Sequence, residues 1–310
     1  MRIIQSHNPR PLNLLAIGPG GLVAAASDAF GAPGDVEVWD AASADRVFDH
    51  TTLATLGNAL ALAFTPSGGH LFVSDAETVA VLDTTGWTWA RNPLLSDWRP
   101  RLMLAASGTR LLAGSDLRSD GGLECLSIDA ELNVRSLWIT ARGFESLMDA
   151  FAISRDTTRA ALVKQLDFTG RPTRTLAVLD AESGNQLTRV SLDPASPVWQ
   201  LAFTADGAKL LVRTDDRKVQ LFDAATGAAA GELVHPGRPY VTGVAVHPRG
   251  PVACARTNGT VTLWNPDTRE QLRTFDWKAG KLVSVAFSPD GALAAAGTED
   301  GKIVVWDVDV

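Results

Sequence analysis

The sequence predicts an all-β fold made of seven repeats with four antiparallel strands each. A short pattern recurs along the whole chain at intervals of roughly 40–50 residues, a period that is typical of repeat architectures. Each copy holds short apolar runs separated by turn residues, and no window has the spacing of a long amphipathic helix. The two ends of the chain supply the parts of one incomplete repeat. Together these observations predict a closed ring.

The first strand of each repeat ends just before a turn that in most repeats contains Pro or Gly. In the last repeat, Phe287 is followed by Ser288-Pro289-Asp290-Gly291. Pro presets φ for the first corner of such a turn, and Gly accepts the positive φ that the turn requires at its end. The equivalent strand ends in the seven repeats are Ile17, Phe64, Leu104, Ile153, Phe203, Val246 and Phe287.

The other three strands differ in polarity. The second is a short run rich in Ala and Val, as in residues 21–27 and 292–297, and it reads as buried on both faces. The fourth is more polar and alternates, as in residues 270–276, which is typical of an outer strand. The third ends on an apolar residue followed by Asp or Asn: Trp39-Asp40, Leu82-Asp83, Ile128-Asp129, Leu179-Asp180, Phe222-Asp223, Trp264-Asn265 and Trp306-Asp307.

These motifs resemble the WD40-repeat β-propeller family. The likeness is strongest in the last repeat, at Ser288-Pro289-Asp290-Gly291, Asp300-Gly301 and Trp306-Asp307, and weaker where Leu82, Ile128, Leu179 and Phe222 replace Trp. The resemblance implies a single domain over residues 1–310, folded as a seven-bladed β-propeller with four antiparallel strands per blade. The implied blades lie at about residues 12–49, 58–95, 99–140, 147–192, 198–234, 241–276 and 282–310.

The two chain ends predict how the ring closes. Residues 2–6 precede the first strand of the first repeat, and the chain stops directly after the third strand of the last repeat. We therefore expect residues 2–6 to form the outer strand of the last blade, which is the closure that the family resemblance implies. Closing the ring removes strand edges that would otherwise invite aggregation.

The resemblance also implies structural roles for a hydrogen-bonded chain of His, Ser or Thr, Asp and Trp inside a blade. His7, Ser27, Asp35 and Trp39 would form one such chain, and His235, Thr257 and Trp264 a second. His70 and His247 lie in hairpin turns, where we expect them to be solvated. The last blade holds the motif residues Asp300, Trp306 and Asp307, which we also expect to be structural.

Composition excludes some classes of function. The net charge is −7 and no run of Lys or Arg occurs, which argues against nucleic-acid binding. No apolar stretch is long enough to span a membrane. The two cysteines, Cys125 and Cys254, lie in apolar strand patterns and are expected to be buried free thiols in a reducing, cytoplasmic compartment. The Ala-rich, Lys-poor composition is typical of a bacterial protein.

The best candidates for contact with a partner lie where the chain departs from the repeat. Three connections between second and third strands are expanded, at residues 28–35, 116–122 and 166–174. In the family these connections share one face with the segments that precede each first strand, and Trp, Tyr and Arg there are typical of interfaces. The candidates are Trp98, Arg99, Arg101, Arg142, Trp199, Tyr240 and Lys281. Alternatively, Trp98, Trp199 and Tyr240 pack between blades. Trp87 and Trp89 would share one face of the outer strand of the second blade.

The leading hypothesis is a non-catalytic, monomeric scaffold that binds a protein or peptide. The chain has no nucleophile elbow, no P-loop and no pair of histidines at metal-ligand spacing, so we expect no cofactor, metal or catalytic residue. The alternative is a lactonase- or dehydrogenase-like enzyme with a metal in the central channel. The side chains that would line such a site form a poor ligand set: Asn13, Asn58, Arg101, Asp149, Gln200, Thr242 and Ser284.

Overall fold

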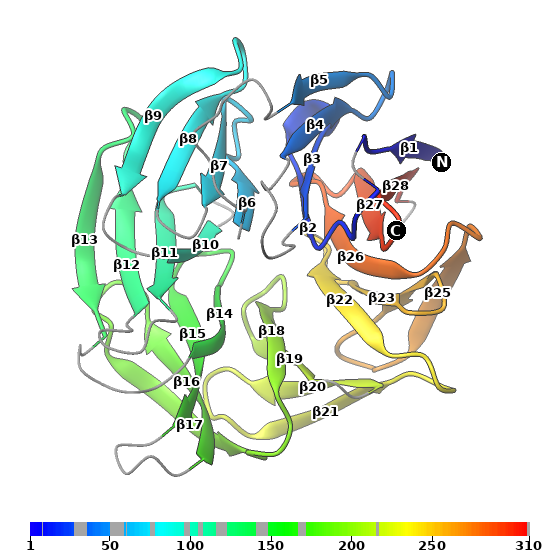
Figure 1. Ribbon diagram of the computed structural model, residues 1–310. Helices are drawn as coiled ribbons and strands as arrows, with labels where there is room; N and C mark the ends of the chain where they lie inside the picture. Colours follow the sequence, from blue (N-terminus) through cyan, green and yellow to red (C-terminus); the bar gives the residue numbers. More distant parts are fainter. Residues whose placement is uncertain are drawn as a thin grey trace.

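The computed structural model describes residues 1–7, 9–27, 36–49, 59, 61–74, 78–95, 100–104, 108–115, 123–140, 148–166, 172–214 and 217–308. These residues form seven four-stranded sheets, and the sheets are arranged as blades around a central axis (Figure 1). All strand pairs inside a blade are antiparallel, for example β10 with β11 and β27 with β28. The predicted fold, a seven-bladed β-propeller, is confirmed.

The first four blades follow one another along the chain. Blade 1 holds β2 (Leu14–Ile17), β3 (Leu22–Ala26), β4 (Glu37–Asp40) and β5 (Arg46–Asp49); blade 2 holds β6 (Ala61–Phe64), β7 (His70–Ser74), β8 (Val79–Asp83) and β9 (Thr88–Leu95). Blade 3 holds β10 (Pro100–Leu104), β11 (Arg110–Ser115), β12 (Leu123–Ile128) and β13 (Val134–Ile139); blade 4 holds β14 (Met148–Ile153), β15 (Arg159–Leu166), β16 (Pro172–Asp180) and β17 (Gln186–Leu192).

The last three blades repeat the order and complete the ring. Blade 5 holds β18 (Val198–Phe203), β19 (Lys209–Thr214), β20 (Lys218–Asp223) and β21 (Ala229–Val234); blade 6 holds β22 (Val241–Val246), β23 (Val252–Arg256), β24 (Thr260–Trp264) and β25 (Gln271–Asp276). Blade 7 holds β26 (Leu282–Phe287), β27 (Leu293–Thr298), β28 (Lys302–Asp307) and, from the start of the chain, β1 (Arg2–Gln5).

The N-terminal strand closes the ring as the sequence predicts. β1 pairs with β28 in antiparallel register, with Arg2 opposite Val305 and Gln5 opposite Lys302. Alternation along β1 buries Ile4, which is 4% exposed, and leaves Ile3 46% exposed. The Arg2 guanidinium also donates a hydrogen bond to the carbonyl of Ala41 in blade 1. The seam between blades 7 and 1 is therefore held by β1 on both sides.

Burial across a blade follows the polarity of the strands. All residues of the second strand β23 and the third strand β24 are buried, whereas five of the six residues of the outer strand β25 are exposed. Blades pack face to face, so Trp39 of blade 1 shares a cluster with Ile4, Ile303 and Val305 of blade 7. The residues that replace Trp elsewhere are also buried: Leu82, Ile128, Leu179 and Phe222.

In blades 1 to 6 the Asp or Asn at the end of the third strand shapes the next turn. Oδ1 of Asp40 accepts hydrogen bonds from the N–H groups of Ala42 and Ser43 at 2.7 and 2.8 Å. The hydrogen bonds from Ser43 and Ala42 lower the pKa of the Asp40 carboxyl. Equivalent hydrogen bonds from turn N–H groups reach Asp83, Asp129, Asp180, Asp223 and Asn265. The apolar–acid pairs of the sequence are therefore strand ends with turn caps.

Trp87 and Trp89 cover the flank between blades 1 and 2. Trp87 lies in the turn before β9 with φ of 51°, and its ring stacks on Phe48 at 5.1 Å between centroids. Both tryptophans pack against the cluster that blades 1 and 2 share. In the described part of the chain the one helical element is η1 (Pro19–Gly21), and none there is long and apolar enough to cross a membrane.

Candidate interaction surface

Trp199 lies at the start of the first strand of blade 5 and projects into solvent. Its side chain is 55% exposed. The ladder between β18 and β19 shifts register between Val198 and Gln200, so Trp199 is the extra residue of a β-bulge. A bulge interrupts the regular ladder at the extra residue and re-aims its side chain. The alternative that Trp199 packs between blades is therefore wrong.

The same bulge recurs in four neighbouring blades. Register shifts at the start of the first strand occur in β14, β18, β22 and β26, where the extra residues are Asp149, Trp199, Thr242 and Val283. First strands start on the face that carries the connections between blades, because the four strands run alternately up and down. Blade 5 alone of these four places an aromatic side chain there.

Tyr240 precedes the first strand of blade 6 and is 53% exposed. Its backbone is fixed on both sides: the Tyr240 N–H donates to Oγ1 of Thr257 at 3.0 Å, and the Thr257 N–H donates to the Tyr240 carbonyl at 3.1 Å. Tyr240 and Trp199 therefore stand on adjacent blades of one face, each exposed and each held by its backbone. We call this pair the aromatic rim.

The segment that precedes Tyr240 rests on a buried cation. Arg256 is 6% exposed, and its guanidinium donates to the carbonyl of Pro236 at 2.7 Å. Burial lowers the pKa of Arg256. Gln200 of β18 donates to the carbonyl of Val244 in β22 at 2.7 Å and accepts from the Val244 N–H at 3.0 Å, which joins the first strands of blades 5 and 6. Hydrogen bonds within blade 6 and between blades 5 and 6 therefore hold the backbone beneath the aromatic rim.

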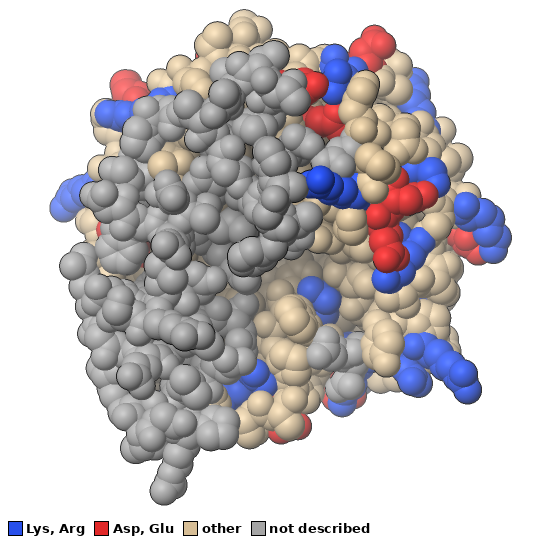
Figure 2. All heavy atoms as spheres, viewed as in Figure 1, with Lys and Arg blue, Asp and Glu red and all other residues tan. Residues whose placement is uncertain are grey.

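The remaining predicted contact residues are less favourably placed or lie outside the described residues. Lys281 forms an ion pair of 2.9 Å with Glu299, and the two side chains are 45% and 52% exposed. Trp98, Arg99 and Arg142 lie outside the described residues, as do residues 28–35, 116–122 and 167–171 of the expanded loops. Arg101 belongs to β10, but its side chain is outside the described set. Figure 2 shows Lys and Arg beside Asp and Glu on the blades that are described.

The hydrogen-bonded chain of blade 6 differs from the prediction. Nε1 of Trp264 donates to Oγ1 of Thr262 at 3.0 Å, and that oxygen lies 3.3 Å from Nδ1 of His235. The sequence-based choice of Thr257 is wrong, because Thr257 is used by Tyr240. Thr262 lies two residues before Trp264 on the same strand, and side chains two apart share a face.

Blade 7 lacks this acceptor. The strand register places Val304 where blade 6 has Thr262. The Trp277 ring packs on Trp306 at an angle of 42° with 4.5 Å between centroids, in the place where His235 meets Trp264 edge-on at 4.9 Å. Val304 cannot accept a hydrogen bond, and Nε1 of Trp306 is buried without a partner among the described residues. The two blades are thus a natural pair for comparison.

Thr262→Val is expected to lower the free energy of unfolding by about 1–3 kcal/mol, because the buried N–H of Trp264 loses its acceptor. Val304→Thr supplies an acceptor to the Trp306 N–H. The control Val261→Thr buries a hydroxyl on the face of β24 opposite Thr262, where no such N–H needs it. Val304→Thr should therefore lower the free energy of unfolding by at least about 1 kcal/mol less than Val261→Thr does. Urea unfolding of the three variants measures both differences. Equal costs for the two Val→Thr changes would contradict this explanation.

Acid is expected to destabilise the fold through His235. Burial, followed by the nearby Arg256, lowers the pKa of His235 from 6.5 to about 4. Between these values the unfolded chain binds a proton that the folded protein does not, so stability is full above pH 6.5 and falls as the pH drops toward 4. The loss should reach about 3 kcal/mol, at 1.36 kcal/mol per pKa unit.

Urea midpoints at pH 7.5, 6.0 and 5.0 test this dependence. We expect His235→Gln to flatten the decline of stability with falling pH relative to the unmodified protein, whereas His70→Gln, at the half-buried first residue of β7, should leave that decline unchanged. If the urea midpoint falls equally with pH in the unmodified protein and in His235→Gln, a group other than His235 causes the pH dependence of stability.

The predicted chain of blade 1 is replaced by a buried carboxylate. Glu37 is 3% exposed; its Oε1 lies 2.8 Å from Nη1 of Arg46 and 3.3 Å from Nδ1 of His7, and its Oε2 accepts from the Ser6 hydroxyl. Trp39 is buried as expected for a structural residue, and Asp35 lies outside the described residues. Ser27 is also buried and has a partner of its own. Glu37 precedes Trp39 by two residues, the position that Thr262 holds in blade 6.

His247 is buried rather than solvated. Its exposure is 0%, its Nε2 lies 2.9 Å from the carbonyl of Gly291, and its Nδ1 accepts from the N–H of Arg249. The ring also meets Phe287 edge-on at 5.0 Å. His247 therefore connects the first turns of blades 6 and 7. It is buried because the first turn of a blade is covered by the next blade.

The described residues hold two buried cysteines and no cluster of metal-binding side chains. Burial raises the pKa of the Cys125 thiol to about 11 and that of Cys254 to about 12, and both cysteines are free, so neither is a reactive thiolate. Within the described ranges, no three His, Cys, Asp or Glu side chains are close enough to hold a metal ion. At the channel wall, Ser284 donates to the carbonyl of Leu12 at 2.6 Å and Gln200 is bonded to Val244.

Comparison with known proteins supports the WD40-repeat class. The sequence model of the family described as "WD domain, G-beta repeat" matches residues 269–307. The chain is 28% identical over 129 residues to the WD repeat-containing protein SL1-17 of Schistosoma mansoni, which is 42% of each sequence. It is 25% identical over 155 residues to the Protein LST8 homolog of Drosophila melanogaster, covering 47% of this chain and 50% of that protein.

The likeness to a solved structure covers the whole ring. The β-propeller domain of Cps50 (Swd1) from Myceliophteria thermophila superimposes with a TM-score of 0.73 over 99% of each chain, at 16% sequence identity. Identity at this level shows the fold alone. The chain spans half or less of the length of the curated relatives it matches. The relatives named here are eukaryotic, and a bacterial source stays a prediction.

Proposed function

We propose that this protein is a non-catalytic scaffold that binds a protein or peptide on the face carrying the connections between blades. WD40 propellers typically act as protein-interaction scaffolds, which supports the general role. The choice of face rests on one observation: Trp199 and Tyr240 are each more than half exposed at the starts of adjacent blades. No feature of the described residues favours the alternative of an enzyme site in the channel.

The aromatic rim has the properties of interface anchors. Trp and Tyr dominate binding energy in protein interfaces because they bury a large area with few rotatable bonds. The bulge at Trp199 and the paired hydrogen bonds at Tyr240 fix the backbone before any partner arrives. Binding would then cost little conformational entropy, so a given contact area would give a higher affinity.

Photo-crosslinking tests this assignment. A photoreactive phenylalanine analogue is placed at position 199 or 240, and for comparison at Leu187 or Leu272, which are 52% and 51% exposed on the outer strands of blades 4 and 6. After irradiation in an extract of the native cells, the crosslinked proteins are identified by mass spectrometry. We expect one protein to be captured at both rim positions and at neither outer-strand position.

The contrary result is equally clear. If the same proteins are captured at all four positions, or if a partner is captured at Leu187 or Leu272 alone, the aromatic rim is not the binding surface. Purified captured protein then serves for direct binding measurements.

A further inference from the structure

Blade 6 carries a local excess of positive charge at the aromatic rim, although the protein as a whole is acidic. The net charge of the chain is −7, yet residues 233–266 contain no Asp or Glu, and this is the longest such stretch of the sequence. It runs from the end of β21 through Tyr240 to just past β24, and the structure describes all of it. The stretch contains Arg238, Arg249 and Arg256. Carboxylates that could neutralise these cations must therefore come from other segments.

The acids that border this stretch are already paired. Glu232 pairs with Lys218 at 2.7 Å, and Asp267 pairs with Lys209 on the opposite face of the ring. In blade 5, residues 213–217 hold two Arg and two Asp, which together add no net charge. The excess of positive charge beside the rim therefore belongs to blade 6.

Arg238 is the exposed cation of this surface. It lies in the connection between β21 and β22, two residues before Tyr240, and therefore stands on the face of the aromatic rim. No ion pair in the described part of the chain uses Arg238, whereas Lys281, on the next connection, pairs with Glu299 at 2.9 Å. An exposed guanidinium of this kind can bind a carboxylate from another molecule.

Arg256 adds a buried charge beneath the same connection. Its guanidinium donates to the carbonyl of Pro236, and its Nε is buried without a partner among the described residues. No carboxylate of those residues pairs with Arg256, in contrast to the buried Glu37, which Arg46 contacts at 2.8 Å. A charge held away from water is weakly screened. Its field therefore raises the positive potential over the connection above it.

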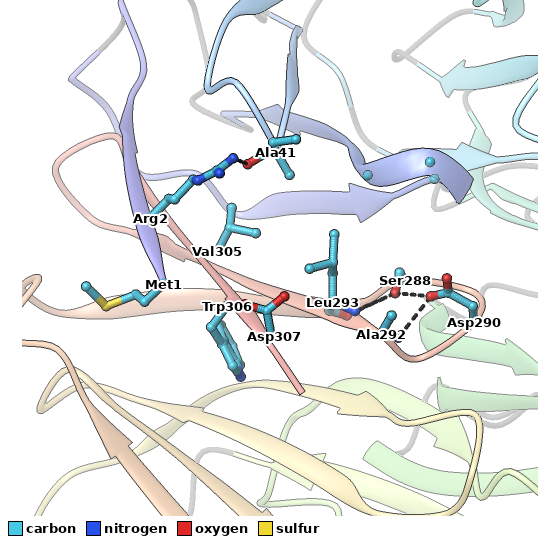
Figure 3. Close-up of a pocket in the computed structure, with 14 residues that line it drawn as sticks. Met1, Arg2, Ala41, Ser288, Asp290, Ala292, Leu293, Val305, Trp306 and Asp307 are labelled. Carbon is cyan, nitrogen blue, oxygen red and sulfur yellow. Dashed lines mark hydrogen bonds between the residues drawn. The ribbon is translucent and has the colours of Figure 1, made fainter. Parts of the chain in front are cut away.

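The opposite face of the ring mixes both signs of charge where it is described. A pocket of about 410 Å³ lies there at the seam of blades 1 and 7, and it is lined by Arg2 as well as by Asp290 and Asp307 (Figure 3). Further round the same face, Arg110 pairs with Glu182. Selection of a partner by charge is therefore expected on the rim face, where blade 6 presents one sign.

We propose, resting on the function proposed above, that the partner segment bound at the aromatic rim is acidic and places an Asp or Glu carboxylate on Arg238. Two parallel N–H groups of a guanidinium suit the two oxygens of a carboxylate. Trp199 and Tyr240 supply the apolar contact area. Complementary charge brings an acidic segment to this face faster and disfavours basic segments.

Selection from a library of short random peptides displayed on phage tests the proposal. The peptides are selected on the unmodified protein and, in parallel, on Arg238→Glu and on the matched control Arg249→Glu. Arg249 is an exposed arginine of the same acid-free stretch, but it lies in the first turn of blade 6, on the opposite face. We expect Asp and Glu to be enriched about 2-fold or more on the unmodified protein and on Arg249→Glu, and this enrichment to be lost on Arg238→Glu.

Fluorescence anisotropy of one selected peptide measures the contribution of charge. The reference peptide has every Asp and Glu replaced by Asn and Gln. The reference should bind the unmodified protein at least about 5-fold more weakly than the acidic peptide, and Arg238→Gln should at least halve this ratio. Added NaCl should weaken the acidic peptide more than the reference, because salt screens exposed charges.

The double variant Trp199→Ala, Tyr240→Ala separates failure of this proposal from failure of the proposed function. If the selected peptides bind the double variant as well as the unmodified protein, the aromatic rim is not the binding surface and both fail. If the peptides need the rim but show no excess of Asp and Glu, or keep that excess on Arg238→Glu, the rim stands and an acidic partner is excluded. A selection that enriches no peptide would count against both.

Discussion

Deletion of residues 1–8 is expected to lower the thermal midpoint by roughly 10 °C or more. The deletion removes β1, which supplies the outer strand of blade 7 and buries Ile4 against Ile303 and Trp39. It also removes Ser6 and His7, two of the three groups among the described residues that contact the buried carboxylate of Glu37. Loss of the apolar burial lowers the free energy of unfolding by about 2–3 kcal/mol. Loss of two partners of the buried Glu37 carboxylate lowers it further, and together these losses give a shift of this size.

Two point variants in β1 distinguish the effect of lost packing by this strand from the effect of a shorter chain. Ile4→Ala should lower the free energy of unfolding by about 2–4 kcal/mol, because Ile4 is 4% exposed between two blades. Ile3→Ala, one residue away and 46% exposed, should cost less than about 1 kcal/mol. Calorimetry of the deletion and urea unfolding of both variants provide the values. A deletion protein that keeps its thermal midpoint would show that β1 does not close the ring.

Arg46→Ala is expected to cost about 3–5 kcal/mol, the range seen when one partner of a buried ion pair is removed. Arg46 contacts Oε1 of Glu37 at 2.8 Å, and Glu37 is 3% exposed. Without the guanidinium, the partners that the carboxylate keeps in the described part of the chain are the Ser6 hydroxyl and the largely exposed His7. A buried charge with so little compensation destabilises the folded state.

Lys218→Ala is the matched control for Arg46→Ala. Lys218 pairs with Glu232 across two strands of blade 5 at 2.7 Å, but that carboxylate is 37% exposed. An exposed pair of this kind contributes about 0–1 kcal/mol. Urea unfolding at pH 7.5 measures the difference between the variants. If Arg46→Ala and Lys218→Ala cost the same, burial of Glu37 does not matter to the stability of the seam.

The repeat made most of the fold predictable from sequence. Aligning the strand ends gave the number of blades, and the unmatched strands at the two chain ends gave the closure by β1. The loss of Trp in four blades did not obscure the fold, because Leu82, Ile128, Leu179 and Phe222 fill the same buried position. Burial of that position requires a large apolar side chain, and Trp is only one way to provide it.

The candidate surface was only partly predictable. Position in the repeat identified Trp199 and Tyr240, but their exposure depends on a local bulge and on the hydrogen bonds of Thr257. Neither feature leaves a signal in one sequence. The roles of Glu37 and Thr262 could have been found, since both stand two residues before a Trp and therefore share its face.

Titration of the partner captured at the aromatic rim tests the central claim most directly. Isothermal calorimetry compares the unmodified protein with the double variant Trp199→Ala, Tyr240→Ala and with the control Leu187→Ala, Leu272→Ala, whose side chains are equally exposed on outer strands. At about 1.4 kcal/mol or more for each aromatic anchor, the rim variant should bind at least about 100-fold more weakly, and the control within about 3-fold of the unmodified protein. Unchanged affinity of the rim variant would contradict the proposed surface.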